Sequence, residues 1–215
     1  MYPLLEAKHI SHSFDYELFN DIHITVNAHD TIAIRGVSGS GKSTFLNILS
    51  TFLKPKSGEV FINNQNIYTL KEQQLVDMRA DKIGVVFQFH YLLKGLSAYE
   101  NLQTASIISK SEIDDNLLKK LKIDHVMHQK VTELSGGQQQ RISIARVLTK
   151  KPTLIFADEP TGNLDEETAK DVMDELFNYV KINNAALVMV THDKNIANQC
   201  QKIYELTKNH LILEE

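Results

Sequence analysis

Residues 31–44 read TIAIRGVSGSGKST, an apolar run followed by a glycine-rich loop that ends on a lysine and two hydroxyl residues. Residues 36–43 match the pattern G-x-x-x-x-G-K-[ST] between an expected strand at 31–35 and an expected helix at 43–52. Glycines in such a loop let successive backbone N–H groups converge on a phosphate, and the positive end of the next helix lies toward the same anion. A glycine-rich turn with an exposed lysine is the alternative. The strand-loop-helix context favours a nucleotide phosphate site.

Within this loop, three side chains have separate expected roles. Lys42 should reach the β- and γ-phosphates, the Ser43 hydroxyl should bind Mg²⁺, and Thr44 is placed for the α-phosphate. The nucleotide-binding residues expected here are Gly36, Val37, Ser38, Gly39, Ser40, Gly41, Lys42, Ser43 and Thr44.

The composition excludes several classes of protein. The formal net charge of -4 offers no global basic surface, so we expect no nucleic-acid partner. Cys200 is the single cysteine, which excludes an internal disulfide framework and a cysteine metal cluster. No apolar stretch approaches the roughly 18 to 20 residues of a membrane span. If the chain serves a membrane, we expect it to do so through a partner.

Alternating strand and helix patterns predict an α/β fold with a largely parallel sheet. The expected strands are 4–10, 18–26, 31–35, 59–62, 83–87, 154–157 and 186–190, and the expected helices are 43–52, 113–123, 138–148, 166–180 and 194–199. With 215 residues and no linker, we expect a single domain over 1–215. Helix-forming runs predict a helical subdomain over 88–135, inserted within the α/β core.

Two acids follow the buried strand expected at 154–157. Asp158 would hold Mg²⁺, and Glu159 could act as a general base for an attacking water. Ligands of parallel sheets bind at the carboxyl ends of the strands, which is where these residues lie. The alternative is that these are simply two acids at the start of a surface loop. The presence of the phosphate loop favours the catalytic interpretation over this alternative.

The segment LSGGQQQR at 134–141 predicts a second phosphate-facing helix. Ser135 can cap a helix whose first turn is glycine, which leaves N–H groups and the helix dipole open toward an anion. An ordinary capped helix is the alternative.

In this order, the phosphate loop, Gln88, LSGGQQQR, ADEP at 157–160, Asp165 and His192 resemble the nucleotide-binding domain of ABC ATPases over nearly the whole chain. The resemblance implies a P-loop NTPase (RecA-like) core with a mainly parallel sheet and N-terminal antiparallel β elements, ATP and Mg²⁺ as cofactors, and ATP hydrolysis. It also implies a head-to-tail homodimer in which Ser135 and Gly137 of one copy close over the ATP of the other.

The resemblance assigns roles residue by residue. Gln88 would sense the γ-phosphate and Mg²⁺ and couple them to a membrane partner, His192 would contact the γ-phosphate, and Phe14 would stack on adenine. Tyr16 could take the place of Phe14, and a packed core aromatic is a further alternative. The implied catalytic residues are Glu159, His192, Gln88 and Lys42; the metal ligands are Ser43, Gln88 and Asp158; and the ATP contacts outside the loop are Phe14, Ser135, Gly136, Gly137, Gln138 and Asp165.

Three further segments resemble the lipoprotein-releasing (LolD-like) and macrolide-exporter (MacB-like) branch: QFHYLL at 88–93, SAYENL at 97–102 and ADEPTGNLD at 157–165. The likeness implies an ATPase subunit that powers a separate membrane partner, with lipoprotein release favoured over macrolide-type efflux or a cell-division role of the FtsE type. Integral membrane permease subunits would dock near 88–100, which would hold the chain peripherally at the cytoplasmic face of the inner membrane. The transported substrate is not encoded in these motifs.

Overall fold

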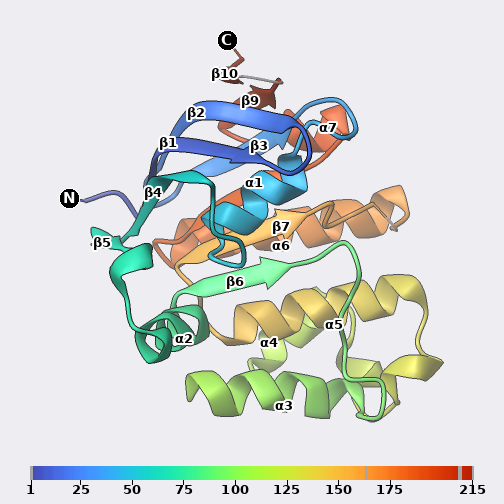
Figure 1. The fold of residues 1–215 in the computed structure, drawn as a ribbon. Coiled ribbons are helices and arrows are strands. Elements are labelled where there is room, and N and C mark those ends of the chain that lie inside the picture. The colour runs from blue at the N-terminus through green and yellow to red at the C-terminus, as the bar shows by residue number, and fades with distance from the viewer. Residues whose placement is uncertain (1, 163, 208–209, 215) are drawn as a thin grey trace.

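The computed structural model describes residues 2–162, 164–207 and 210–214, which form two β-sheets and a set of covering helices (Figure 1). The strands are β1 (Leu5–Ser13), β2 (Glu17–Val26), β3 (Thr31–Arg35), β4 (Ser57–Ile62), β5 (Gln65–Asn66), β6 (Ile83–Val86), β7 (Leu154–Asp158), β8 (Ala186–Val190), β9 (Lys202–Leu206) and β10 (Leu211–Leu213). The α-helices are α1 (Lys42–Leu49), α2 (Glu72–Asp81), α3 (Ala98–Ser109), α4 (Asp115–Lys120), α5 (Gly136–Thr149), α6 (Glu166–Ile182) and α7 (Lys194–Ala197).

A six-stranded sheet in the order β10-β9-β3-β8-β7-β6 forms the centre of the molecule. All its neighbouring strands pair in parallel except β10, which is antiparallel to β9. The fold class predicted from the sequence, an α/β core with a mainly parallel sheet, is therefore confirmed.

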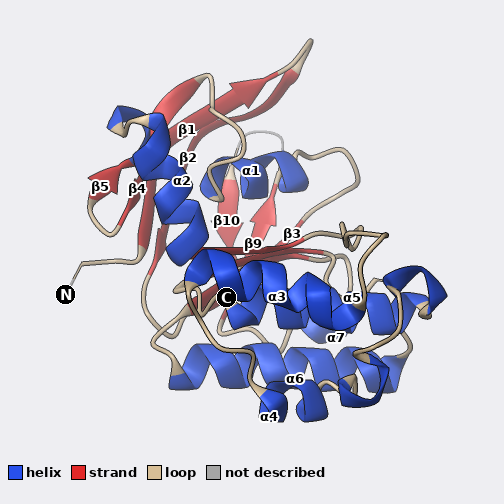
Figure 2. Ribbon diagram, turned by 90° about the horizontal axis from the view of Figure 1, so that it is seen from below, coloured by secondary structure: helices blue, strands red, loops and turns tan. Residues whose placement is uncertain are grey.

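Both faces of the central strands are buried, as their continuous apolar runs require. In β7, Ile155 and Ala157 join the core made with α5 and α6, whereas Leu154 and Phe156 join the core made with α1. Successive side chains of a strand point to opposite faces, so this division follows directly from the sequence. Figure 2 shows α5 and α6 on the same side of the molecule, running next to each other.

The second sheet has four antiparallel strands in the order β2-β1-β4-β5. Its inner face, which carries Ile10, Ile22 and Val60, packs into the same core as Phe45 and Leu49 of α1. Helix α1 lies between this sheet and the central sheet in Figure 1. The N-terminal antiparallel elements implied by the resemblance are therefore present, and they hold the helix that follows the phosphate loop.

Helices α3 and α4 fall within the 88–135 region. Leu102 of α3 and Leu118 of α4 are buried in the core that α5 and α6 share, so this region is packed on the central sheet through those helices. The division into one domain with a helical subdomain at 88–135 stays a prediction. Among the described helices, not one combines the length and apolar character needed to cross a membrane.

Gly84 of β6 lies where the strand meets the α5 side of the sheet. A Cβ atom there would come within 2.5 Å of Val147 Cγ1 and 2.9 Å of Pro152 Cγ. Because overpacking a filled core costs about 1–3 kcal/mol, Gly84→Ala should lower the free energy of unfolding by that amount, measured by urea denaturation. Gly95→Ala is the control, because a Cβ at Gly95 would meet no described atom within 4 Å. Equal stability of the two variants would contradict this packing.

Candidate active site

Four neighbouring strands of the central sheet end at one edge, and each delivers a segment with polar side chains there. The loop at 36–41 follows β3, Asp158 and Glu159 end β7, Thr191 and His192 follow β8, and Gln88 lies just after β6. Parallel strands place their carboxyl ends together, so these segments surround one pocket of about 370 Å³. The pocket is lined by Phe14, Tyr16, Leu18, Ser38, Gly39, Gly41, Lys42, Ser43, Thr44, Gln88, Asp158, Glu159, Val190 and His192.

The phosphate loop needs glycine at two of its positions. Gly36 has a φ of 150°, and a Cβ there would lie 2.5 Å from the Leu206 carbonyl oxygen. Gly41 has a φ of 91° and stands directly before α1, where a Cβ would press on the Phe19 ring at 3.1 Å. No side chain of the described residues caps α1, so its first N–H groups face the pocket edge unpaired and suit a phosphate.

Lys42 lies over this loop. Its Nζ donates hydrogen bonds of 2.9 Å to the carbonyl oxygens of Gly36 and Val37. Val37 is itself exposed and Ser40 is buried beneath the loop, and neither lines the pocket. Of the nine loop residues predicted to bind nucleotide, the structure thus places six on the pocket wall.

Asp158 and Ser43 form an oxygen pair at the floor of the site. The two side chains are hydrogen-bonded, and burial is the main cause that raises the pKa of Asp158, partly offset by that hydrogen bond. A divalent cation would favour the ionised carboxylate that burial penalises. Carboxylate, hydroxyl and amide oxygens are ligands that Mg²⁺ accepts, and Gln88 lines the same pocket, so the residues present fit this ion.

Glu159 adopts a backbone conformation that few non-glycine residues take. Its φ is 47°, and its N–H donates to the Val190 carbonyl oxygen at 2.9 Å. Oε1 accepts from the His192 backbone N–H at 3.0 Å and lies 2.8 Å from His192 Nδ1, while the Thr191 hydroxyl donates to Oε2 at 3.3 Å. Such strain persists where surrounding contacts fix it, and it is concentrated at functional sites. Here the contacts with Val190, Thr191 and His192 fix the Glu159 backbone and carboxylate at the end of β8.

His192 is held at the pocket mouth by this carboxylate. The hydrogen bond to Glu159, followed by its charge, raises the pKa of the His192 imidazole above its ordinary value of 6.5. The His192 side chain is 77% exposed, so it can reach a ligand in the pocket. The sequence analysis did not predict a role for Thr191. Its hydroxyl is hydrogen-bonded to Glu159 and helps to position that carboxylate. Its place directly before His192 was the one feature of the sequence that could have indicated this role.

Both candidate adenine-stacking residues line the pocket. Phe14 is 60% exposed and Tyr16 is 63% exposed, and the Phe14 ring meets the His12 ring edge-on at 4.9 Å between centroids. The structure therefore excludes the packed-core alternative for both aromatics. The choice of Phe14 as the stacking residue stays a prediction.

The LSGGQQQR segment begins α5 as predicted, but its first residues do not line this pocket. Ser135 Oγ accepts from the Gln138 N–H at 3.3 Å, and Gln138 Oε1 accepts from the Ser135 N–H at 2.9 Å. Asp165 likewise caps α6, and its hydrogen bond from Thr168 lowers the pKa of the carboxyl. The predicted ATP ligands that do not line the pocket are Ser135, Gly136, Gly137, Gln138 and Asp165, in addition to Gly36, Val37 and Ser40 of the loop.

A buried glutamine that the sequence analysis did not single out connects these parts. Gln140 Nε2 donates to the Pro160 carbonyl oxygen at 2.8 Å, and Gln140 Oε1 lies 2.5 Å from His90 Nδ1. Gln140 thereby links α5 to the segment after Glu159 and to the segment after Gln88. In the sequence, the only indication of this role was that Gln140, a polar residue, falls on the face of the helix expected to be buried.

The glycine loop, the paired Asp158 and Ser43, and the strained Glu159 together define a P-loop nucleoside triphosphatase. The chain belongs to the ABC transporter family, whose pattern matches residues 19–162. It carries the ATP-binding domain of that family, and it is an ATPase.

Relatives with known names cover nearly the whole chain. The lipoprotein-releasing system ATP-binding protein LolD of Treponema denticola is 42% identical over 90% of this chain and 88% of its own. The ABC transporter ATP-binding protein YxdL of Bacillus subtilis is 37% identical over 100% of this chain and 87% of its own. The ATP-binding cassette MJ0796, solved as a dimer in a post-hydrolysis state bound to ADP and Pi, superposes with a TM-score of 0.90 at 32% identity, covering 98% of each chain.

The contact between His192 and Glu159 predicts how the imidazole titrates. Its NMR midpoint should lie above 6.5 in the unaltered protein and move down toward 6.5 in Glu159→Gln, because the amide keeps an acceptor but loses the charge. A raised folded pKa means that the pair stabilises the fold fully below pH 6.5 and that this contribution is lost as pH rises through the folded pKa. Glu112→Gln, on the 88–135 region, should leave the midpoint unchanged. An equal shift in both variants would rule out the direct contact as the cause.

Proposed function

We propose that this chain is the ATPase subunit of a transporter that releases lipoproteins from the inner membrane, acting on a separate membrane partner. Its likeness to the lipoprotein-releasing ATP-binding protein over 90% of the chain supports this most. Efflux of the macrolide-exporter type and a cell-division role are the alternatives, and the QFHYLL segment favours lipoprotein release over both.

In the proposed hydrolysis, each group of the pocket has one task. The first N–H groups of α1 and the Lys42 ammonium bind the phosphates, and the Glu159 carboxylate accepts a proton from the attacking water. His192, held beside Glu159 at 2.8 Å, donates toward the γ-phosphate. Bound Mg²⁺, held by Ser43, Asp158 and Gln88, would neutralise phosphate charge.

The LSGGQQQR segment is proposed to act on the ATP of a second copy. Ser135 and Gly136 are exposed at the start of α5 outside the pocket of their own chain, and a Cβ on Gly136 would meet no described atom within 4 Å. A helix start with two glycines and exposed N–H groups is suited to an anion supplied from elsewhere. The dimeric arrangement of the solved cassette supports a homodimer here. Asp165, at the start of α6, would lie in the same interface.

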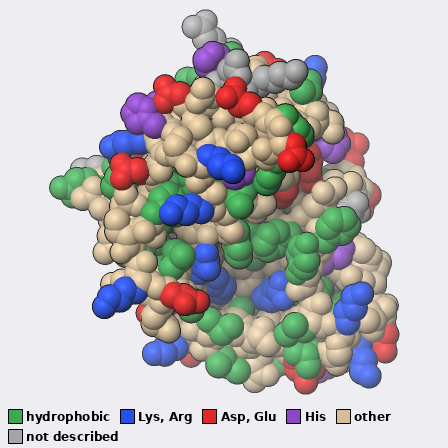
Figure 3. Space-filling model, viewed as in Figure 1, with side chains coloured by type: hydrophobic (Ala, Val, Ile, Leu, Met, Phe, Trp, Pro, Cys, Tyr) green, Lys and Arg blue, Asp and Glu red, His purple; other side chains and the backbone are tan. Residues whose placement is uncertain are grey.

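The surface near residues 88–100 is proposed to dock the membrane permease. Phe89, Tyr91 and Leu93 are 69%, 65% and 48% exposed, an unusual gathering of large apolar side chains on a surface. Beside them a groove of about 280 Å³ is lined by both apolar and basic side chains, among them Phe52, Phe87, Ile108, Arg79, Arg146 and Lys150. Figure 3 shows Lys and Arg side chains beside hydrophobic ones in the hollow across the middle of this face. This docking would place the chain at the cytoplasmic face of the membrane.

Glu159→Gln is the first test of the hydrolytic assignment. The amide cannot accept the proton, so steady-state ATP hydrolysis should fall by about 100-fold or more while ATP binding persists. We expect the ATP-bound variant to accumulate as a dimer in light scattering. Glu112→Gln is the matched control and should hydrolyse ATP normally. Unchanged turnover in Glu159→Gln would remove Glu159 from the mechanism.

The transported cargo can be tested with proteoliposomes that contain the chain and its co-purified membrane partner. With ATP, a lipidated protein in the bilayer should pass to a soluble acceptor, and the Glu159→Gln complex should release none. Its non-lipidated form should not stimulate hydrolysis. ATP-dependent export of a macrolide without release of the lipidated protein would instead support the efflux alternative.

Ser135→Arg tests the shared site. An arginine at this cap removes only about 1 kcal/mol of helix stability, but it places bulk and charge where the second copy's ATP should lie. ATP hydrolysis should therefore fall by at least about tenfold, since phosphate contacts of this kind contribute strongly to the transition state. Circular dichroism should show an intact fold. Asp114→Arg, which alters the cap of α4, is the control, and equal activity of both variants would contradict the shared site.

A further inference from the structure

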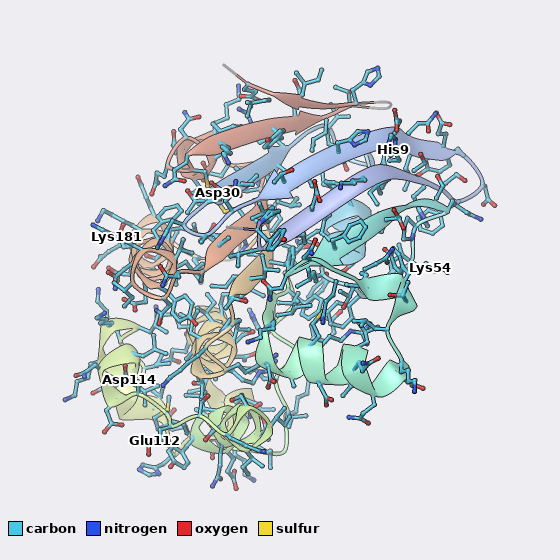
Figure 4. All side chains as sticks on the ribbon, turned by 90° about the vertical axis from the view of Figure 1, so that its left-hand side faces the viewer. His9, Asp30, Lys54, Glu112, Asp114 and Lys181 are labelled. Atoms are coloured by element: carbon cyan, nitrogen blue, oxygen red, sulfur yellow. The ribbon has the colours of Figure 1, made fainter. Side chains whose placement is uncertain are left out.

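Two histidines and an aspartate meet on the outer face of the antiparallel sheet, apart from the nucleotide pocket. His9 comes from β1, and Asp21 and His23 come from β2. One nitrogen or oxygen of each side chain lies within 4.8 Å of the others, and all three residues are exposed. In Figure 4, His9 is labelled on the N-terminal strands. The ATPase mechanism uses none of the three.

The alternation of β2 directs two of these side chains outward. Asp21 and His23 are exposed, whereas Ile22 and Ile24 between and beyond them are buried. Residues two apart in a strand share a face, so burial of the isoleucines fixes the aspartate and the second histidine on the solvent side.

A bulge in β1 brings the first histidine to the same place. Ala7 and Ile10 are both buried, and the pairing with β2 shifts register between them. The extra residue leaves His9 with a φ of 54°, and the His9 carbonyl packs so closely on Gly58 that a Cβ there would lie 2.4 Å from the oxygen. Bulges re-aim side chains in this way. Without the additional residue, the strand alternation would not present His9 beside Asp21.

The three side chains already converge on one oxygen. His9 Nδ1 lies 2.7 Å and His23 Nε2 lies 3.3 Å from Asp21 Oδ1, and the two rings meet edge-on with centroids 4.3 Å apart. The Asp21 backbone is fixed as well, because its N–H donates to Ser11 Oγ at 3.0 Å. Asp21 has a φ of 52°. The arrangement is held by the backbone and is not a chance meeting of long, mobile side chains.

The neighbouring lysine is occupied elsewhere. Lys8 Nζ pairs with Glu6 at 2.9 Å and lies 5.2 Å from the centre of the Phe61 ring. Among the described residues, the hydrogen bond with His9 is the main cause that lowers the pKa of the Asp21 carboxyl, and the charges of His9 and His23 add to it. A carboxylate between two imidazoles is thus free of a competing ammonium group.

We propose that His9, Asp21 and His23 bind a divalent transition-metal ion of the Zn²⁺ type, bridging β1 and β2. The ligands would be His9 Nδ1, His23 Nε2 and one Asp21 oxygen. Two imidazole nitrogens and one carboxylate suit Zn²⁺, Ni²⁺ or Cu²⁺, and they do not suit Mg²⁺ or Ca²⁺, which take oxygen ligands. The exposed position leaves the remaining coordination positions to water. This site is separate from the Mg²⁺ ligands proposed beside the phosphates.

Isothermal titration of the untagged full chain with ZnCl₂ tests the proposal. Excess MgCl₂ is present throughout to compete for the ligands proposed at Ser43 and Asp158. We expect one Zn²⁺ per chain at the outer face, and at least about tenfold weaker binding in His9→Ala and in His23→Ala, because each removes one of three ligands. His125→Ala, which removes another exposed histidine, is the matched control and should bind as the unaltered protein does. Equal affinity in all four proteins, or no Zn²⁺ binding, would overturn the proposal.

Thermal unfolding provides an independent readout that also checks folding. An ion that binds only the folded chain raises its Tm by mass action, so ZnCl₂ should raise the Tm of the unaltered protein and of His125→Ala but not of His9→Ala or His23→Ala. Asp21→Asn keeps the size and one acceptor of the aspartate, and it should lose most of the shift as well. A Zn²⁺-dependent rise that persists in these three variants would place the ion elsewhere and overturn the assignment.

Discussion

The site depends on the burial of both faces of the central strands. Because Leu154 and Phe156 pack toward α1 while Ile155 and Ala157 pack toward α5 and α6, β7 has no freedom to shift or rotate. Its neighbours β3, β8 and β6 are parallel to it, so four strand ends reach the same edge. The acids, His192 and Gln88 are then positioned by the register of hydrophobic strands, whereas Phe14 and Tyr16 reach the pocket from the antiparallel sheet. Packing of the apolar residues fixes the strand ends, and these ends carry the polar residues of the pocket.

At that edge, the adjacent residues Asp158 and Glu159 differ in backbone conformation and in hydrogen-bond partners. Asp158 ends the strand and is paired with Ser43, and burial raises the pKa of its carboxyl. Glu159 breaks the strand geometry at a φ of 47° and is fixed by His192 and Thr191. The charge of Glu159 adds to the burial that raises the pKa of Asp158, and each carboxylate has its own hydrogen-bond partners.

Much of this was predictable from the sequence, because the strands at 31–35, 154–157 and 186–190 are short apolar runs that end in chemically distinctive motifs. Helix α2 escaped prediction since none of its side chains is buried, and thus it shows no apolar period. The helix expected at 113–123 is only Asp115–Lys120, because Leu121 ends it and an irregular turn follows. Ser135 lies outside the pocket of its own chain, which agrees with the head-to-tail dimer implied by the resemblance, and Asp165, expected as an ATP contact, lies outside it as well.

The segments that would have to move together are physically joined. Gln140, one turn into α5, is hydrogen-bonded both to Pro160, which follows Asp158 and Glu159, and to His90, which follows Gln88. Arg146, further along the same helix, donates to the Tyr91 carbonyl oxygen at 3.0 Å. A displacement of α5 therefore breaks its hydrogen bonds to His90 and Tyr91 unless the segment at 89–93 moves with it. The helix proposed to complete a neighbour's site and the surface proposed to meet the membrane partner are thus joined by direct hydrogen bonds.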